Sequence, residues 1–378
     1  MTALDSFRGR PVFITGHTGF KGSWLTLWLH RLGARVSGYS LLPPTEPNNF
    51  STSHVRELLA SHTSADVRDA PQLQGAIEAS KPAVIFHLAA QPLVRRSYVD
   101  PRLTIETNVL GTTGILESVR KLGRPCVVIF VTSDKCYENH DAARRHTETD
   151  PLGGPDPYSA SKAAAEIVIE AYRESFFRPR DVLKHGVKVA SVRAGNVIGG
   201  GDWAADRIVP DTVKSAATNQ TVIVRNPSSI RPWQHVLEPL SGYLALAARM
   251  LQGDDPTLCS GWNFGPNPSE EATVKDVVET LLQSWQCPKW EDASGTIQPH
   301  EEHMLRLSND KARRELGWRP RWSFREAVTH AGRWYHRFYS DPSSSTRDLC
   351  QQDISDYEAA LANESDSLQP VPELAHHS

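Results

Sequence analysis

A short apolar run followed by a glycine-rich turn constrains the fold of this chain more than any other feature. Residues 11–15 read Pro-Val-Phe-Ile-Thr, and glycines follow at positions 16, 19 and 22. Apolar side chains then recur at helical spacing until Gly33, a residue suited to end a helix. A strand, a turn and a helix in this order let the backbone approach a pyrophosphate at the helix start. The sequence therefore predicts a dinucleotide-binding unit, with a glycine turn that holds no ligand as the alternative.

Further apolar runs typical of β-strands occupy residues 35–39, 83–88, 126–131 and 187–193, and helical segments such as 101–121 and 158–177 separate them. Strands that alternate with helices imply a parallel sheet covered on both faces. We expect an α/β fold, a Rossmann-type doubly wound parallel sheet with a smaller C-terminal substrate-binding lobe. The predicted domains are residues 1–194 with later segments returning to them, residues 195–360 as mainly the substrate lobe, and residues 361–378 as a disordered tail.

Composition excludes several classes of protein. The chain has 378 residues, of which 39% are hydrophobic and 22% charged, and its formal charge is −3. No basic run predicts a nucleic-acid partner, and no apolar stretch approaches the roughly 20 residues that span a membrane. The N-terminus lacks the apolar core of a signal peptide, so we expect a cytoplasmic location. The five cysteines are far apart and lack CxxC spacing, which predicts neither disulfides nor a metal site.

Tyr158 stands four residues ahead of Lys162 at the start of a predicted helix, so both side chains lie on one face. An ammonium group within a few ångströms favours an ionised phenol and lowers its pKa by about 1–3 units from about 10. Such a tyrosine can take a proton from an alcohol. A solvated lysine beside a half-buried tyrosine is the alternative, because helices carry this pair by chance.

Other polar or small residues follow the predicted strands directly. Ligands of open parallel sheets bind beyond the carboxyl ends of the strands. Gly16, Ala89-Ala90, Ser133-Asp134-Lys135 and Gly195-Asn196 all fall at such ends. We therefore expect one crevice to collect them.

With these features in place, the chain resembles the extended short-chain dehydrogenase/reductases that act on nucleotide sugars, and within them the CDP-glucose 4,6-dehydratases. The resemblance runs from about Gly9 to about Ala360. It rests on four strings, Thr15 to Trp24 (TGHTGFKGSW), Val131 to Tyr137 (VTSDKCY), Arg193 to Trp203 (RAGNVIGGGDW) and Arg231 to Val236 (RPWQHV).

The resemblance implies an internal redox cycle with NAD as cofactor. Tyr158, helped by Lys162, would take the proton of the sugar 4-hydroxyl while the hydrogen on C4 leaves as hydride, and Ser133 would bind O4. The pair Asp134 and Lys135 would supply the base at C5 and the acid at O6, after which the hydride returns to C6. Many related dehydratases carry Asp-Glu at this pair. Lys135 would act as a base only when neutral, which burial beside Lys162 would favour.

The resemblance also implies the cofactor site. The second strand ends in Gly38-Tyr39-Ser40-Leu41 without the usual acid for the ribose. NAD is kept over NADP because the cycle needs a retained oxidised cofactor. Asp66 is the expected contact of the adenine, with a helix cap or turn residue as the alternative. The cofactor residues so implied, besides Tyr158 and Lys162, are Gly16, His17, Thr18, Gly19, Phe20, Lys21, Gly22, Tyr39, Ser40, Asp66, Val67, Leu88, Ala89, Ala90, Asn108 and Thr132.

For the sugar nucleotide, the resemblance implies Gln91, Asn196, Arg207, Arg231 and His235, of which His235 is more probable as a structural residue than as a catalytic one. Three alternatives stay open: a sugar-nucleotide 4-epimerase, a dehydratase for another nucleoside-diphosphate glucose, and a non-catalytic NAD-binding sensor. Because members of the family pair through helices, the exposed sides of residues 101–121 and 163–177 predict a homodimer or homotetramer.

Overall fold

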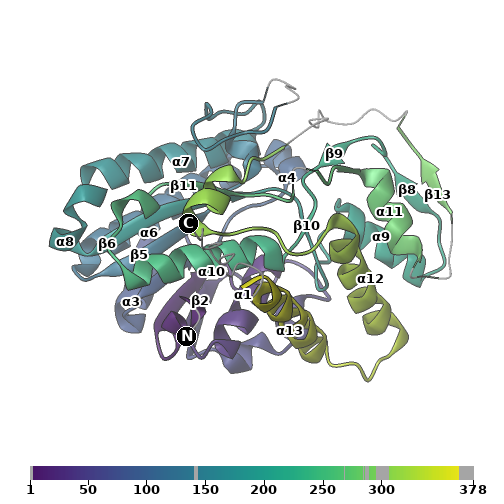
Figure 1. Cartoon of the computed structure of the whole chain (residues 1–378), viewed down its shortest axis with the longest axis horizontal. Helices are drawn as coiled ribbons and strands as arrows, with labels where there is room; N and C mark the ends of the chain where they lie inside the picture. Colours follow the sequence, from purple (N-terminus) through teal and green to yellow (C-terminus); the bar gives the residue numbers. More distant parts are fainter. Residues whose placement is uncertain are drawn as a thin grey trace, which may run out of the picture.

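Seven parallel strands form a single sheet at the centre of the described part of the chain (Figure 1). The computed structural model describes residues 3–139, 144–267, 269–283, 285, 289–294 and 306–365. The strand order is β3-β2-β1-β4-β5-β6-β11, and every neighbouring pair is parallel. The strands are β1 (Pro11–Thr15), β2 (Arg35–Ser40), β3 (Ser61–Ser64), β4 (Val84–His87), β5 (Cys126–Val131), β6 (Val187–Ala194) and β11 (Gly261–Phe264). The order reverses between β1 and β4, which confirms the predicted doubly wound fold.

Alternate side chains of the strands enter two separate cores. On β5, for example, Val127 and Ile129 belong to one core, whereas Val128 and Phe130 belong to the other. The first core is covered by α1 (Phe20–Arg31), α10 (Leu237–Gln252) and α13 (Thr346–Ser365), and the second by α3 (Ala70–Ser80), α6 (Gly111–Leu122) and α7 (Pro157–Ser175). Both faces are therefore buried, as a parallel sheet requires.

The glycine turn after β1 leaves no room for side chains. Gly16 has a φ of +75°, and a Cβ atom there would lie 2.7 Å from the backbone nitrogen of Ala89. A Cβ atom on Gly22 would lie 2.2 Å from the carbonyl oxygen of Gly16. The helix α1 can begin directly above the end of β1 only because these positions are glycines.

Aspartate caps and prolines start the helices next to the site. Asp156 accepts hydrogen bonds from the backbone of Tyr158 and Ser159, both at 2.9 Å, and Pro157 occupies the first turn of α7. Asp100 caps α5 (Pro101–Ile105) in the same way. The predicted helix over residues 101–121 is interrupted by a π-helical turn, η3 (Glu106–Leu110), which carries the buried Asn108, and this residue accepts a hydrogen bond from the backbone of Gln91.

A smaller lobe lies at one end of the sheet, on the right in Figure 1. It contains α9 (Ile208–Ala217), α11 (Val274–Gln283) and α12 (Phe324–Ser340), together with the strand pairs β8 (Val222–Val224) with β13 (Trp290–Asp292) and β9 (Ile230–Arg231) with β12 (Ala272–Thr273). The short strands β7 (Val197–Ile198) and β10 (Gln234–His235) pair beside the sheet. The shorter helices are η1 (Ala3–Phe7), α2 (Asn49–Thr52), η2 (Val55–Leu58), α4 (Val94–Val99), η4 (Asp134–Cys136), η5 (Pro179–Asp181), α8 (Val182–His185), η6 (Pro256–Leu258) and η7 (Ala312–Leu316).

The last helix, α13, leaves the small lobe and returns to the sheet. Glu358 on α13 accepts hydrogen bonds from Trp28 and Arg31 on α1, at 3.0 and 2.9 Å. The sequence predicted a loose tail from residue 361, but α13 continues to Ser365. Residues 366–378 of that predicted tail lie outside the described residues.

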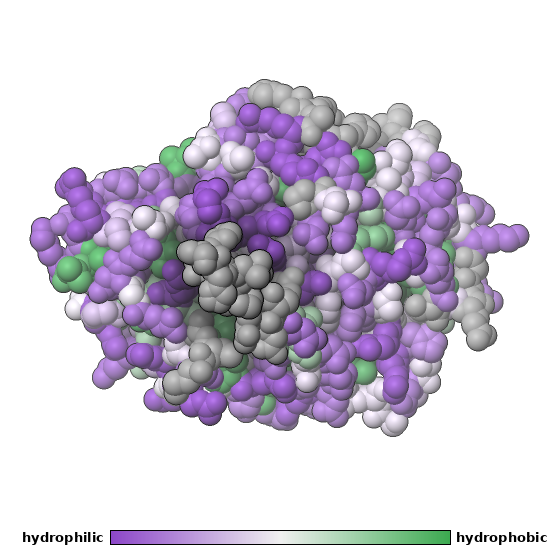
Figure 2. Space-filling model, in the orientation of Figure 1, coloured by the Kyte–Doolittle hydropathy of each residue, from purple (hydrophilic) through white to green (hydrophobic). Residues whose placement is uncertain are grey.

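The described helices include none that is long and apolar enough to cross a lipid bilayer. The face shown in Figure 2 is mainly hydrophilic, with apolar atoms gathered at its left edge, where Figure 1 places α8. Leu183 on α8 is 84% exposed.

Candidate active site

Two elements bring the predicted catalytic residues together at the carboxyl end of the sheet. The turn η4 directly follows β5 and carries Asp134 and Lys135, and the first turns of α7 carry Tyr158 and Lys162. Ser133 caps η4, because its hydroxyl accepts a hydrogen bond from the backbone of Lys135 at 3.2 Å and donates one to the carboxylate of Asp134 at 3.0 Å. All of them except Lys135 are buried.

Tyr158 does not have the lowered pKa that the sequence predicted. Burial raises the pKa of the Tyr158 phenol to about 12, and a hydrogen bond with Ser133 offsets only part of this. The ammonium group of Lys162 donates to the carbonyl oxygen of Val131 at 3.4 Å. That prediction is therefore wrong, because burial is the largest influence on the phenol and outweighs the positive charge of Arg207.

Lys162 itself is also changed by its surroundings. Burial lowers the pKa of Lys162 to about 8, and the negative charge of Glu166 on the same helix acts against this. Glu166 stands one helical turn after Lys162 and two turns after Tyr158, so the three side chains form one stripe along α7. Sequence reasoning missed Glu166, although this spacing was visible.

Lys21 lies among the catalytic groups rather than only in the glycine turn. Its ammonium group donates to the Tyr243 hydroxyl at 3.4 Å. Burial, aided by the charges of Lys162 and Arg207, lowers the pKa of Lys21 to about 7, and Asp134 acts in the opposite direction. The sequence assigned Lys21 to the cofactor and gave no signal for its contact with Tyr243, which is far away in the chain.

Lys135 is half-buried. The sequence expected Lys135 to be buried beside Lys162, but the lysine whose ammonium group lies near Lys162 is Lys21.

The glycine turn forms a cradle that fits the diphosphate of a dinucleotide. Gly19 precedes α1, and no side chain caps the first backbone N–H groups of this helix. Gly16 and Gly22 leave open the space that a Cβ atom would fill. Uncapped N–H groups and the helix dipole favour an anion at this position. The half-buried residues Leu88, Ala89 and Ala90 line the adjoining end of β4.

The His17 side chain packs against the second strand, and its ring is uncharged. Its ring covers Gly38, where a Cβ atom would lie 2.6 Å from the ring, and it shares a hydrogen bond of 2.7 Å with His62. Burial, together with His62, lowers the pKa of His17 to about 3, so this ring is neutral. At the end of β2, the hydroxyls of Thr18 and Ser40 lie 2.8 Å apart where an acid is usual.

Asp66 and Val67, two of the predicted cofactor residues, follow β3. The Asp66 carboxylate accepts hydrogen bonds from the Arg68 side chain at 2.7 and 3.1 Å and from the Arg68 backbone, while the Tyr39 hydroxyl donates to the Asp66 carbonyl oxygen. Asp69, not Asp66, caps α3. Val67 is buried against Gly111.

Three predicted binding residues have side chains that are bound by the protein itself. Asn108 holds the backbone of Gln91 through both of its amide atoms and also donates to Ser161, at 2.8–3.2 Å. The side chain of Gln91 bonds to Leu93 and Thr104, and the Thr132 hydroxyl donates to Glu166. Through these hydrogen bonds, the three side chains hold neighbouring segments of the site in place.

The other predicted substrate residues lie in three different places. Asn196 is half-buried at the end of β6, and Arg207 pairs with Asp202 at 2.7 Å close to Tyr158. Arg231 lines a cavity with Arg145 and Arg306, both of which pair with Glu271. His235 is fully buried against Trp24 and Trp322, so its contacts within the described residues are those of a packed core side chain, and its assignment to the substrate stays a prediction.

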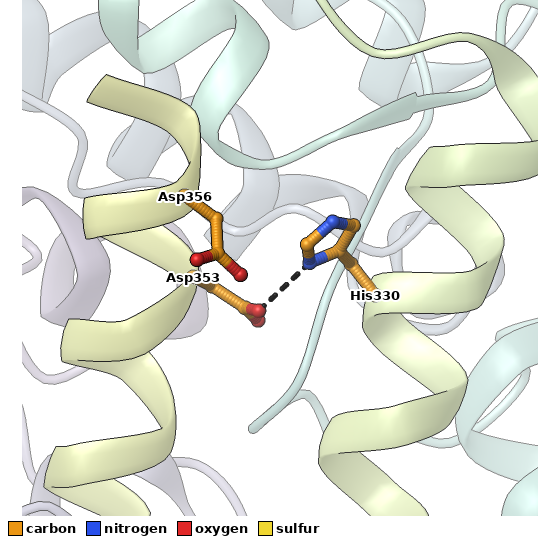
Figure 3. A group of neighbouring side chains, drawn as sticks. All are labelled: His330, Asp353 and Asp356. Carbon is orange, nitrogen blue, oxygen red and sulfur yellow. Dashed lines mark hydrogen bonds and ion pairs between the residues drawn. The ribbon is translucent and has the colours of Figure 1, made fainter. Parts of the chain in front are cut away.

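One acidic cluster lies away from the site. His330 on α12 faces Asp353 and Asp356 on α13 (Figure 3), and the His330 Nδ1 atom is 2.9 Å from Asp353. Arg333 pairs with both carboxylates, at 2.8 and 3.1 Å, and thereby offsets part of their charge. The cluster fastens α13 to α12.

The chain is similar to known proteins over most of its length. A family model described as GDP-mannose 4,6 dehydratase matches residues 13–331. The CDP-glucose 4,6-dehydratase of Salmonella typhimurium is 47% identical over 95% of this chain and 99% of its own length. A dTDP-glucose 4,6-dehydratase of Xanthomonas campestris is 24% identical over 85% of this chain and 92% of its own length.

Solved structures share the fold. The dTDP-glucose 4,6-dehydratase of Streptomyces venezuelae, with NAD and TYD bound, has a TM-score of 0.71 and 25% identity and covers 88% of this chain and 99% of its own. The UDP-glucose 4-epimerase of Thermotoga maritima, with UDP-glucose, has a TM-score of 0.72 and 21% identity and covers 86% of this chain and 99% of its own. The match of the family model and the relative at 47% identity lead to one conclusion: the chain belongs to the GDP-mannose 4,6-dehydratase family.

Proposed function

We propose that this protein is an NAD-dependent hydro-lyase that converts CDP-glucose to CDP-4-keto-6-deoxyglucose and water. The observation that carries the proposal is the buried group of Tyr158, Lys162, Ser133 and Asp134 at the end of the sheet, in a chain 47% identical to a CDP-glucose 4,6-dehydratase. The glycine cradle at the start of α1 fits the diphosphate of the cofactor.

The redox step uses the face of α7. The glycine cradle would hold NAD, which would supply hydride transfer from C4 and back to C6, and a positively charged nicotinamide ring would favour the Tyr158 phenolate. Tyr158 takes the proton of the sugar 4-hydroxyl, and Ser133, whose side chain already hydrogen-bonds Tyr158, orients O4. Lys162 adds a positive charge beneath the phenol.

The elimination uses the turn η4. A ketone at C4 acidifies the hydrogen on C5, so that a base can remove it while an acid protonates the departing O6 as water. Asp134 and Lys135 supply these two groups, and the resulting double bond accepts hydride at C6 and a proton at C5. Replacement of Lys135 by Ala with an unchanged rate of C5 exchange would exclude Lys135 as the base.

The experiment follows the hydrogen of C4. With CDP-glucose deuterated at C4, the dehydratase moves the label to C6 of the product, whereas a 4-epimerase leaves it at C4. A purified protein that carries NAD but converts no nucleoside-diphosphate glucose would favour the non-catalytic sensor. Turnover with the CDP, dTDP, GDP and UDP forms of glucose identifies the base, and Tyr158→Phe, expected to lose at least about 100-fold in kcat, is the inactive control.

The subunits would pair through α5, α6 and α7. Ile105, Leu110 and Ile167 on these helices and the intervening π turn are 48%, 57% and 56% exposed. Apolar side chains that stay exposed together mark an interface. We propose a homodimer or a dimer of dimers, and Ile167→Glu is expected to give monomers in sedimentation experiments, with Leu183→Glu on α8 as the matched control.

A further inference from the structure

A buried ion pair lies directly beneath the catalytic groups. Glu166 on α7 and Arg193 on β6 are 3% and 5% exposed. Two nitrogens of the Arg193 guanidinium group donate to the two oxygens of Glu166, at 2.9 and 2.8 Å. Ser191 and Thr132 donate to the same carboxylate. Such a bidentate pair has one geometry, because the planar fork of arginine fits a carboxylate in a single orientation.

The pair binds both ends of the catalytic turn. Thr132, which directly precedes Ser133, donates its hydroxyl to Glu166. Tyr137, which directly follows Cys136, accepts a hydrogen bond of 2.7 Å from the remaining nitrogen of Arg193. The Tyr137 hydroxyl then donates to Asn263 on β11, also at 2.7 Å. The carboxylate of Glu166 therefore binds the residue before the turn of residues 133–136, and the guanidinium group of Arg193 binds the residue after it.

The same pair also fixes the helix that carries the tyrosine and lysine. Glu166 is on the face of α7 that presents Lys162 and Tyr158, which lie one and two turns nearer the start of the helix. A shift of the helix relative to the turn would have to break the bonds between Glu166 and Arg193. The redox groups on α7 and the acid–base groups on η4 are thus both attached to the Glu166–Arg193 pair, in addition to the direct bond from Lys162 to Val131.

We propose that the Glu166–Arg193 pair is a positioning device that sets the distance between the acid–base turn and the Tyr158–Lys162 face of α7. The inference rests on the proposed dehydratase function, which needs both sets of groups around one sugar. The pair touches no reacting atom, and it acts through Thr132 and Tyr137. A misplacement of about 1 Å at a reacting group can cost about 100-fold in rate.

Two conservative variants test the proposal without breaking the ion pair. Tyr137→Phe removes the tether at the exit of the turn, and Thr132→Val removes the tether at its entrance. In each variant Glu166 and Arg193 still bind each other, so the protein should fold. Tyr172→Phe is the matched control, since Tyr172 lies on the same helix and its hydroxyl donates to the distant Glu117.

The expected result is a split between the two half-reactions. In Tyr137→Phe we expect elimination to slow at least about tenfold while oxidation at C4 changes less than about twofold, and in Thr132→Val we expect elimination to slow by at least the same factor. Reduced cofactor should then accumulate on the enzyme during turnover, with KM nearly unchanged. Amide hydrogen exchange in residues 132–137 should rise in the variants even without substrate. Tyr172→Phe should match the unmodified protein in every measurement.

The two proposals fail in different ways. If the unmodified protein converts CDP-glucose but the variants slow both half-reactions equally, or show unchanged hydrogen exchange in the turn, the positioning role is overturned. If the unmodified protein converts no nucleoside-diphosphate glucose while the variants still loosen the turn, the dehydratase function fails and the mechanical link between pair and turn stands.

Discussion

Two buried glutamates lie on helices that cover opposite faces of the sheet, and their pKa values are shifted in opposite directions. Glu166 on α7 lies against Arg193, whereas Glu238 on α10 accepts hydrogen bonds from the backbone of Arg321 and Trp322 and from the Tyr357 hydroxyl. Burial alone would raise the pKa of Glu166, but the charge and hydrogen bonds of Arg193 hold it below its usual value. Burial raises the pKa of Glu238 to about 7.

The difference shows what a charged partner does that neutral donors do not. Both carboxylates have their hydrogen bonds satisfied, so a count of bonds would predict similar behaviour. The adjacent charge and hydrogen bonds of Arg193 offset the loss of water around Glu166, whereas the hydrogen bonds to Glu238 and the charge of Arg321 offset it only in part. The Glu166–Arg193 pair lies beneath the catalytic turn. Glu238 and its hydrogen-bond donors lie at the junction of α10 and α13.

The largest expected effect comes from breaking the charged pair. Glu166→Gln leaves the guanidinium group of Arg193 buried without a counter-charge, and we expect the free energy of unfolding at pH 7 to fall by about 3–5 kcal/mol. Urea titration measures this change. Glu174→Gln, at the exposed end of α7, is the control and should change it by less than about 0.5 kcal/mol. A loss below about 1 kcal/mol for Glu166→Gln would contradict the comparison.

The next effect concerns Glu238 and depends on pH. Its pKa is higher in the folded state than in the unfolded state, so the folded protein binds the proton more tightly between about pH 4.5 and 7. The contribution of Glu238 is therefore favourable below this window and is lost as the pH rises through about 7, by up to about 3 kcal/mol.

Glu238→Gln removes this dependence, because the amide is neutral at every pH and its oxygen can still accept the backbone hydrogen bonds. We expect the variant to be about 1–3 kcal/mol more stable than the unmodified protein at pH 8 and nearly equal to it at pH 5. Thermal or urea unfolding at the two pH values measures the difference. An equal loss of stability at both values would mean that the carboxylate is buried as an ion.

A double variant sharpens the comparison. Glu166→Leu with Arg193→Met replaces both charges by apolar groups, which avoids the uncompensated ion, and stability should lie within about 2 kcal/mol of the unmodified protein. Dehydratase turnover should nevertheless stay low, because the tethers of Thr132 and Tyr137 are gone. Full turnover in a stable double variant would show that the pair serves the fold alone.

The smallest expected change in stability comes from an exposed ion pair. The side chains of Arg68 and Asp66 are 36% and 30% exposed. Water and salt screen such a pair, so Arg68→Met should cost less than about 1 kcal/mol in the free energy of unfolding. Repetition of the urea titration at high salt should abolish the difference, whereas the effect of Glu166→Gln should persist.

Local patterns were sufficient for the elements that carry the site. The runs at 11–15 and 126–131 are strands with those bounds, the glycines at 16 and 22 have no room for side chains, and Asp156 with Pro157 starts α7. Each of these features depends on residues close together in the chain, and periodicity and capping chemistry report on such neighbours directly.

Interactions between distant segments were not accessible in this way. Nothing local to Lys21 predicts its contact with Tyr243, and nothing local to Asn108 or Gln91 predicts that they bind each other. The pKa of Tyr158 was predicted in the wrong direction, because a lysine four residues away is visible in the sequence and burial is not.

The sequence by itself determined the strand–turn–helix cradle, the parallel sheet and the face of α7 that presents Tyr158 and Lys162. The tertiary structure alone decided which of these groups are charged and what holds them in place. The physical reason is that backbone geometry depends on near neighbours in the chain. The state of an ionisable group depends instead on how much water is excluded and which distant charge, such as Arg193, replaces it.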